Sequence, residues 1–211
     1  ISENDLFDIV LPPFKECIGV CAASIMTAFN DINGVPASGN SYLLNNLLRK
    51  KWNYNGVVLS DWESTAQMIT HGYTPSYKEA AYKAFNASLD VEMVSRTYED
   101  NLVELLNEGR IEESQIDDAV RRVLRMKFNL GLFENPFAHT GKFPELLNAN
   151  HREIAKELAQ ESVVLLKNSN NILPLKIGIR KITIIGPLAD APHEQLGTWI
   201  FDGSKDDAIT P

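Results

Sequence analysis

The sequence has few residues of the kinds that bind metals or cross-link a fold. It contains 2 cysteines and 4 histidines among 211 residues, and the histidines are scattered singly. Neither residue type has the spacing of a metal site. Cys17 and Cys21 stand four positions apart on one face of an expected helix, where a disulfide would have poor geometry. We therefore expect buried free thiols, no metal and no cofactor.

Two further absences narrow the class of protein. Acidic residues outnumber basic ones by 28 to 20, and no lysine and arginine cluster interrupts the net charge of −8. A nucleic-acid partner is therefore not expected. No apolar run approaches the roughly 18 residues of a membrane-spanning helix, so no membrane span is expected. A composition with 44% hydrophobic and 23% charged residues is typical of a globular protein.

The most informative segment runs from Gly56 to Trp62 and reads Gly-Val-Val-Leu-Ser-Asp-Trp. A short apolar run that follows turn residues predicts a strand buried on both faces. This strand stops at Asp61. In barrels and open α/β sheets the carboxyl ends of parallel strands carry the chemistry, which favours a catalytic Asp61. The alternative is that Asp61 caps the next helix, since aspartate is a favoured N-cap residue.

Helix and strand patterns alternate from residue 24 to Gly131. Strands are predicted at residues 24–30, 57–59 and 89–94, and helices at residues 41–51, 76–85, 98–108 and 114–130. Ser76 and Glu79 form a capping box, and Gly109 and Gly131 are typical of helix ends. The alternation predicts an α/β fold with a parallel sheet. About three strands are too few to close a barrel.

The composition changes after Gly131. Asparagine, proline and glycine are frequent in a predicted linker that runs to Pro144, and a helix is predicted at residues 151–160. Short apolar strands are then predicted at residues 163–166 and 182–185, as at the opening of a second α/β domain. The chain begins at Ile1 without a basic and apolar leader, and we interpret it as a piece of a longer or processed protein.

Several of these segments are also similar to those of one enzyme family. They are residues 26–34 (Met-Thr-Ala-Phe-Asn-Asp-Ile-Asn-Gly), 47–62, 109–133, 161–175 and Gly-Pro-Leu-Ala-Asp at 186–190. In this order they resemble glycoside hydrolase family 3, the β-glucosidase and β-xylosidase group, and particularly its bacterial periplasmic β-glucosidases. The resemblance implies the C-terminal part of a (β/α)8 barrel at residues 1–133, a linker and helix at 134–160, and the start of an α/β sandwich at 161–211. It also implies a periplasmic or secreted location.

The resemblance assigns roles to three residues. Asp61 matches the family's catalytic nucleophile, and Trp62 matches a position that flanks the sugar. Phe29 matches a position beside the nucleophile that is often tyrosine in the family, so a hydroxyl is missing here. Core packing is the alternative role for both Trp62 and Phe29. The implied activity is hydrolysis of terminal β-D-glycosyl residues by a retaining double-displacement mechanism, with β-glucosyl residues as the preferred substrate.

A retaining glycosidase also needs a second carboxyl group. Glu63 and Glu92 lie near the predicted strand ends, and we interpret both as supporting or solvated residues. In the family's β-glucosidases the acid/base lies in the sandwich domain, beyond the end of this chain. The expected partners are therefore a β-glycoside or oligosaccharide substrate and the remainder of the chain's own polypeptide, and the chain alone is expected to be inactive. The alternatives are a carbohydrate-binding or inactive family member and an N-acetylglucosaminidase of the family.

Overall fold

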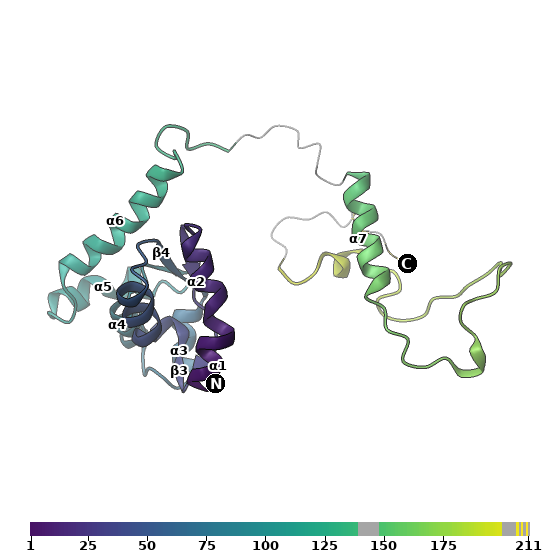
Figure 1. The fold of residues 1–211 in the computed structure, drawn as a ribbon, viewed down its shortest axis with the longest axis horizontal. Helices are drawn as coiled ribbons and strands as arrows, with labels where there is room; N and C mark the ends of the chain where they lie inside the picture. Colours follow the sequence, from purple (N-terminus) through teal and green to yellow (C-terminus); the bar gives the residue numbers. More distant parts are fainter. Residues whose placement is uncertain (139–147, 200–205, 207, 209, 211) are drawn as a thin grey trace. The chain divides into compact units, whose positions relative to one another are not determined.

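The computed structural model describes residues 1–138 and 148–199, together with residues 206, 208 and 210. It forms two units, Ile1–Thr140 and Gly141–Pro211, which are described separately below (Figure 1). The predicted linker and helix of residues 134–160 fall partly outside the described part, because residues 139–147, including His139, are not described.

Three parallel strands form the centre of the first unit. They are β1 (Ser24–Met26), β4 (Val57–Trp62) and β5 (Val91–Met93), in the order β1-β4-β5. Ser24 lies opposite Val57, and Leu59 lies opposite Val91. A two-stranded antiparallel ribbon, β2 (Asp31–Ile32) and β3 (Val35–Pro36), follows β1. The three-stranded parallel sheet confirms the arrangement that the helix and strand pattern predicts.

Nine helical segments accompany the sheet in the described part of the first unit. They are α1 (Glu3–Asp5), η1 (Leu6–Val10), α2 (Leu11–Gly19), η2 (Ala37–Gly39), the π-helix η3 (Tyr42–Lys51), α3 (Ser64–Thr70), α4 (Tyr77–Asn86), α5 (Thr97–Asn107) and α6 (Glu113–Asn129). Ser76 Oγ accepts a hydrogen bond from Glu79 N at 3.3 Å, which confirms the Ser76 half of the predicted capping box, whereas the Glu79 carboxylate accepts from Arg110 Nη1 at 2.6 Å. Gly109 and Gly131 adopt φ values of 69° and 67° just after α5 and α6, as helix-ending glycines do.

The apolar faces of these helices form two clusters. Leu44 and Leu48 of η3 pack with Val58 of β4, Met68 of α3 and Ala84 of α4, which confirms the predicted apolar stripe of residues 41–51. A second cluster joins α4 with α5 and α6 and contains Ala81, Phe85, Leu105, Ile111 and Ala119. Within the sheet the central strand β4 is the buried one, with Val57 and Val58 at most 2% exposed, whereas β1 and β5 contain no fully buried residue.

A chain of buried hydroxyl groups ties the first strand to the helices beside it. Thr27 Oγ1 and Ser38 Oγ lie 2.7 Å apart, and Ser38 Oγ lies 2.7 Å from Ser64 Oγ. The three residues follow β1, sit in η2 and begin α3 respectively, and each is at most 5% exposed. Each hydroxyl therefore has a hydrogen-bond partner although it is removed from water.

The two cysteines differ from their expected environment. Both are free, as expected, but Cys17 and Cys21 are exposed, so the expectation of buried thiols is wrong. Helix α2, which carries Cys17, has no buried residue. Cys21 lies beyond the end of α2, in a left-handed backbone conformation with φ of 66°. The four-residue spacing predicted one helix face, but the helix ends before the second thiol is reached.

In its described residues the second unit contains one long helix, α7 (Ala149–Glu161), which Asn148 caps by accepting a hydrogen bond from His151 N at 2.9 Å. Short helical turns follow at η4 (Ser169–Asn171) and η5 (Pro192–Leu196). The strands predicted at residues 163–166 and 182–185 are absent from the described part, which corrects that expectation. Leu166 and Ile185 are 92% and 90% exposed. An isolated apolar segment forms a strand only when another strand supplies hydrogen bonds and a covered face.

None of the helices in the described ranges combines the length and the apolar character needed to cross a membrane. The longest helix of the first unit, α6, has 17 residues, and charged side chains are distributed along it.

Candidate active site

The carboxyl ends of the three strands meet at one edge of the sheet. Asp61 and Trp62 are the last two residues of β4, and Trp62 lies opposite Met93, the last residue of β5. Phe29 comes three residues after the end of β1, and Thr27 N still donates to Leu59 O of β4 at 2.9 Å. The side chains predicted for the site are therefore carried to the same edge. Phe29, Asp61 and Trp62 are all half-buried.

The strand that carries Asp61 is irregular at this edge. Between the paired positions Leu59 and Trp62, β4 has one more residue than β5 has between Val91 and Met93. This extra residue is a β-bulge, a feature that often occurs next to active sites and changes the direction of a side chain. After the bulge, Glu63 N donates to Met93 O at 3.0 Å, so the two strands remain joined beyond Asp61.

The Asp61 carboxylate is bound to its own strand. Its Oδ1 accepts a hydrogen bond from Trp62 N at 2.7 Å. Asp61 does not cap the following helix, because α3 begins at Ser64 and its N-cap is Glu63, which makes no side-chain capping bond. The cap interpretation of Asp61 is therefore not supported. No ion pair to Asp61 is recorded within the described ranges.

The two glutamates near the strand ends have different environments. Glu63 is exposed and adopts φ of 54°, and its backbone makes the turn from β4 into α3. Glu92 is half-buried, and its two carboxylate oxygens accept hydrogen bonds from Thr97 Oγ1 at 2.6 Å and Tyr98 N at 3.0 Å. Glu92 thus caps α5, whose N-cap residue Arg96 makes no side-chain capping bond. These contacts are those of a residue that supports the structure.

Replacing Glu92 with alanine tests this assignment. We expect a loss of about 1 kcal/mol in the free energy of unfolding, the usual effect of losing a helix cap. In a longer protein that contains this chain, we expect any glycosidase activity to stay within a few-fold of the unchanged value, because the Glu92 side chain caps α5. Urea titration and a glycosidase assay measure the two effects. Glu92→Gln, which keeps an acceptor for Tyr98 N, is the matched control and should be less destabilised. Loss of activity in the stable glutamine variant would show that Glu92 is an acid/base.

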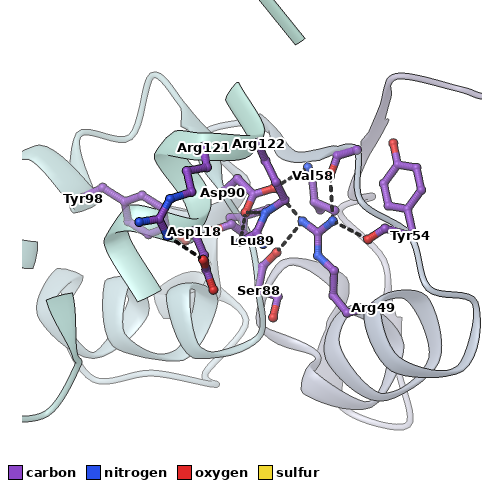
Figure 2. A network of polar contacts seen from close by, with 11 residues as sticks. Arg49, Tyr54, Val58, Ser88, Leu89, Asp90, Tyr98, Asp118, Arg121 and Arg122 are labelled. Carbon is purple, nitrogen blue, oxygen red and sulfur yellow. Dashed lines mark hydrogen bonds and ion pairs between the residues drawn. The ribbon is translucent and has the colours of Figure 1, made fainter. Parts of the chain in front are cut away.

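The opposite edge of the sheet holds a buried ionic network that sequence patterns did not predict. Figure 2 shows Asp90, just before β5, between Arg49 of η3 and Arg122 of α6. Asp90 Oδ1 binds Arg122 Nη2 at 2.8 Å, and Asp90 Oδ2 binds Arg49 Nη2 at 2.5 Å and accepts from Val58 N at 2.9 Å. The available signal was an aspartate inside a predicted apolar strand.

Burial dominates the electrostatics of this network. The Asp90 side chain is 1% exposed and that of Arg49 is 11% exposed. Burial lowers the pKa of Arg49, while the neighbouring Asp90 carboxylate raises it. Arg49 also donates to Tyr54 O at 3.0 Å and to Gly56 O at 2.6 Å, which fixes the loop that leads into β4. The network thus joins η3, β4, β5 and α6 at the edge away from Asp61. At this edge of the sheet the network is expected to hold the strands in place and not to bind substrate.

Comparison with known proteins shows that the chain is similar to members of one enzyme family. The glycosyl hydrolase family 3 N-terminal domain matches residues 1–126. The periplasmic β-glucosidase of Salmonella typhimurium is 35% identical over 216 residues, which cover 100% of this chain and 28% of that protein. A β-xylosidase of Formosa agariphila is 33% identical over 212 residues, covering 94% of this chain and 29% of that protein.

A solved structure agrees with these relatives. The β-glucosidase of Listeria innocua in complex with glucose is 37% identical, with a TM-score of 0.77, and the match covers 100% of this chain and 29% of that one. The predicted fold class is confirmed, since the α/β fold of the first unit is part of the family's barrel domain. The domain limits at residues 133 and 160 stay predictions. Because the family's N-terminal domain matches residues 1–126 of the 211 and the relatives align along nearly all of the chain, the chain belongs to glycosyl hydrolase family 3.

Proposed function

We propose that the chain supplies the nucleophile of a retaining β-glycosidase, and that this nucleophile is Asp61. The observation that carries the proposal is the position of its carboxylate. Asp61 is half-buried at the carboxyl edge of a parallel sheet, on a bulge, and within the described ranges its carboxylate accepts one hydrogen bond, from Trp62 N of its own strand. The half-buried position at this edge of the sheet is one that supports a nucleophilic carboxylate.

The chemistry requires an ionised carboxylate. In a retaining mechanism it attacks the anomeric carbon and forms a glycosyl ester, and a second carboxyl group about 5–5.5 Å away protonates the leaving oxygen and then activates water. Aspartate has the lower reference pKa of the two acidic residue types, which suits the nucleophile. Trp62 and Phe29 offer apolar ring faces at the same edge against which a sugar packs.

The second carboxyl group is proposed to come from outside these 211 residues. Glu92 is occupied in capping α5, and Glu63 is exposed on the turn after β4. The chain spans about 28% of the length of the Salmonella relative. We therefore refer to a protein of the relatives' length that contains this chain as the full-length protein. The 211-residue chain alone should lack turnover.

The substrate is proposed to be a terminal β-D-glycoside, with glucose preferred over xylose at the cleaved position. Relatives named β-glucosidase and β-xylosidase both align with the chain, so the two sugars form the natural test pair. A periplasmic or secreted location is proposed with it, because the Salmonella relative is named periplasmic. The missing hydroxyl at Phe29 favours one competing function, a family member that binds carbohydrate without cleaving it.

A 2-deoxy-2-fluoro β-glucoside with a good leaving group tests the proposal on the full-length protein. The fluorine slows hydrolysis of the glycosyl ester, so the label should remain on the nucleophile. Digestion and mass spectrometry should place the added mass on the peptide that contains Ser60, Asp61 and Trp62. The nitrophenyl β-glucoside, β-xyloside and β-N-acetylglucosaminide then rank the sugars. A label on another carboxylate would contradict the assignment of Asp61, and binding without labelling or turnover would favour the non-catalytic alternative.

A further inference from the structure

The hydroxyl of Ser60 occupies the bulge that carries Asp61. Ser60 is 0% exposed. Its Oγ accepts a hydrogen bond from Met93 N of β5 at 2.7 Å and donates one to Asp61 O at 2.8 Å. One buried hydroxyl therefore connects the end of the neighbouring strand to the peptide group of the proposed nucleophile. Both bonds are short and both reach backbone atoms, which are the least mobile partners in the sheet.

These two hydrogen bonds restrain the backbone that orients the Asp61 side chain. An inserted residue breaks the regular ladder between two strands, which leaves the bulged backbone free to tilt. The bond to Asp61 O fixes the peptide plane that follows Asp61, and the bond that Trp62 N donates to Asp61 Oδ1 fixes the carboxylate against that same peptide. The orientation of the carboxylate thus depends on the backbone, and the backbone depends on Ser60.

We propose that Ser60 is a positioning residue that holds the Asp61 carboxylate in the direction of attack. The inference rests on the proposed function of Asp61 as nucleophile. Serine meets three requirements at once: it accepts from Met93 N, it donates to Asp61 O, and it fits a site without exposed surface. Alanine loses both bonds. Cysteine keeps the shape, but its thiol is a weaker donor and acceptor than a hydroxyl.

The test compares Ser60→Ala with the unchanged full-length protein in the rate of labelling by the 2-fluoro glycoside. Displacing a reacting group by about 1 Å costs on the order of a hundredfold in rate. We therefore expect the maximal labelling rate to fall about ten- to a hundredfold in Ser60→Ala. The concentration of the 2-fluoro glycoside that gives half of this maximal rate should change less than about threefold. The maximal labelling rate of Ser60→Cys should lie between those of Ser60→Ala and the unchanged protein. Rates are measured well below the melting temperature, so that all variants are folded.

Ser38→Ala is the matched control. Ser38 is also a buried serine with two hydrogen bonds, but its partners are the hydroxyl groups of Thr27 and Ser64 and not Asp61. It should lower the melting temperature and leave the labelling rate unchanged. A Ser60→Ala protein that melts lower but labels at the normal rate would overturn the inference and leave Ser60 with a purely structural role. If Ser60→Ala does not fold, an unchanged labelling rate in Ser60→Cys overturns it equally.

Asp61→Asn, run in parallel, separates this inference from the proposed function. If Asp61→Asn is still labelled at the normal rate, Asp61 is not the nucleophile, and both proposals are wrong. If labelling is lost in Asp61→Asn but normal in Ser60→Ala, only the positioning role of Ser60 is wrong. Loss in the first and a reduced rate in the second support both.

Discussion

Replacing Asp61 with asparagine is expected to abolish turnover by the full-length protein while the fold stays intact. The amide has nearly the same shape as the carboxylate, and its oxygen can still accept the bond from Trp62 N, so packing at the strand end barely changes. It is neutral and cannot form the glycosyl ester or stabilise an oxocarbenium-like transition state. Losing the nucleophile should lower the rate by several powers of ten, each about 1.4 kcal/mol of transition-state stabilisation.

The measurement is turnover of nitrophenyl β-glucoside, together with a thermal melt that verifies folding. Glu63→Gln is the matched control, because Glu63 is a carboxylate two residues further on that is exposed to solvent. It should retain activity within a few-fold. Retained activity in Asp61→Asn would refute the nucleophile assignment. Loss of activity in both variants would mean that charge at this edge matters in general and that Asp61 has no unique role.

Replacing Asp90 with alanine is expected to give the largest loss of stability in the first unit. The change leaves the Arg49 and Arg122 guanidinium groups, with side chains 11% and 20% exposed, without their carboxylate. It also leaves Val58 N without its acceptor. Removing one partner of a buried ion pair typically costs about 3–5 kcal/mol, since a desolvated charge then remains unpaired. This loss approaches the whole stability of many small domains.

Urea titration of the free energy of unfolding measures this effect. The matched control is Asp118→Ala, which removes a carboxylate that pairs with Arg121 at 3.1 Å, both side chains being 61% exposed. An exposed pair contributes about 0–1 kcal/mol, so the control should be nearly neutral. Asp90→Asn keeps an oxygen that can accept from Val58 N but carries no charge. Its loss in the free energy of unfolding should lie between those of Asp90→Ala and Asp118→Ala. A loss near that of the control would mean that the buried network contributes little to stability.

Asp61 and Asp90 are expected to have different roles at the two ends of the same strands. Asp61 and Asp90 belong to neighbouring strand regions but stand at opposite edges, one at the carboxyl end of β4 and one before the start of β5. The half-buried Asp61 carboxylate accepts a hydrogen bond from Trp62 N, whereas Asp90 is enclosed by two arginines and a backbone N–H. Mutation at the first edge should therefore change chemistry without stability, and mutation at the second should change stability first.

Local patterns in the sequence were sufficient for most elements of the first unit. The apolar stripe that includes Leu44 and Leu48, the cap at Ser76 and the glycines after α5 and α6 each depend on residues within one or two helical turns. The strand ending near Asp61 and the parallel sheet followed from the same local information. Resemblance to family motifs then indicated the family, which comparison with known proteins confirmed.

Contacts between distant residues were decided by tertiary structure alone. Ser60 and Met93 are 33 positions apart, and Arg49 and Asp90 are 41 apart, so no local pattern could pair them. The bulge at Asp61 exists only because β5 lies beside β4 in a particular register. The same reason explains the failed expectations. Burial of Cys17 requires an element packed over α2, and strands at residues 163–166 and 182–185 require neighbouring strands. A sequence determines which segments can form helices or strands by itself, whereas burial and strand pairing depend on what lies next to them in space.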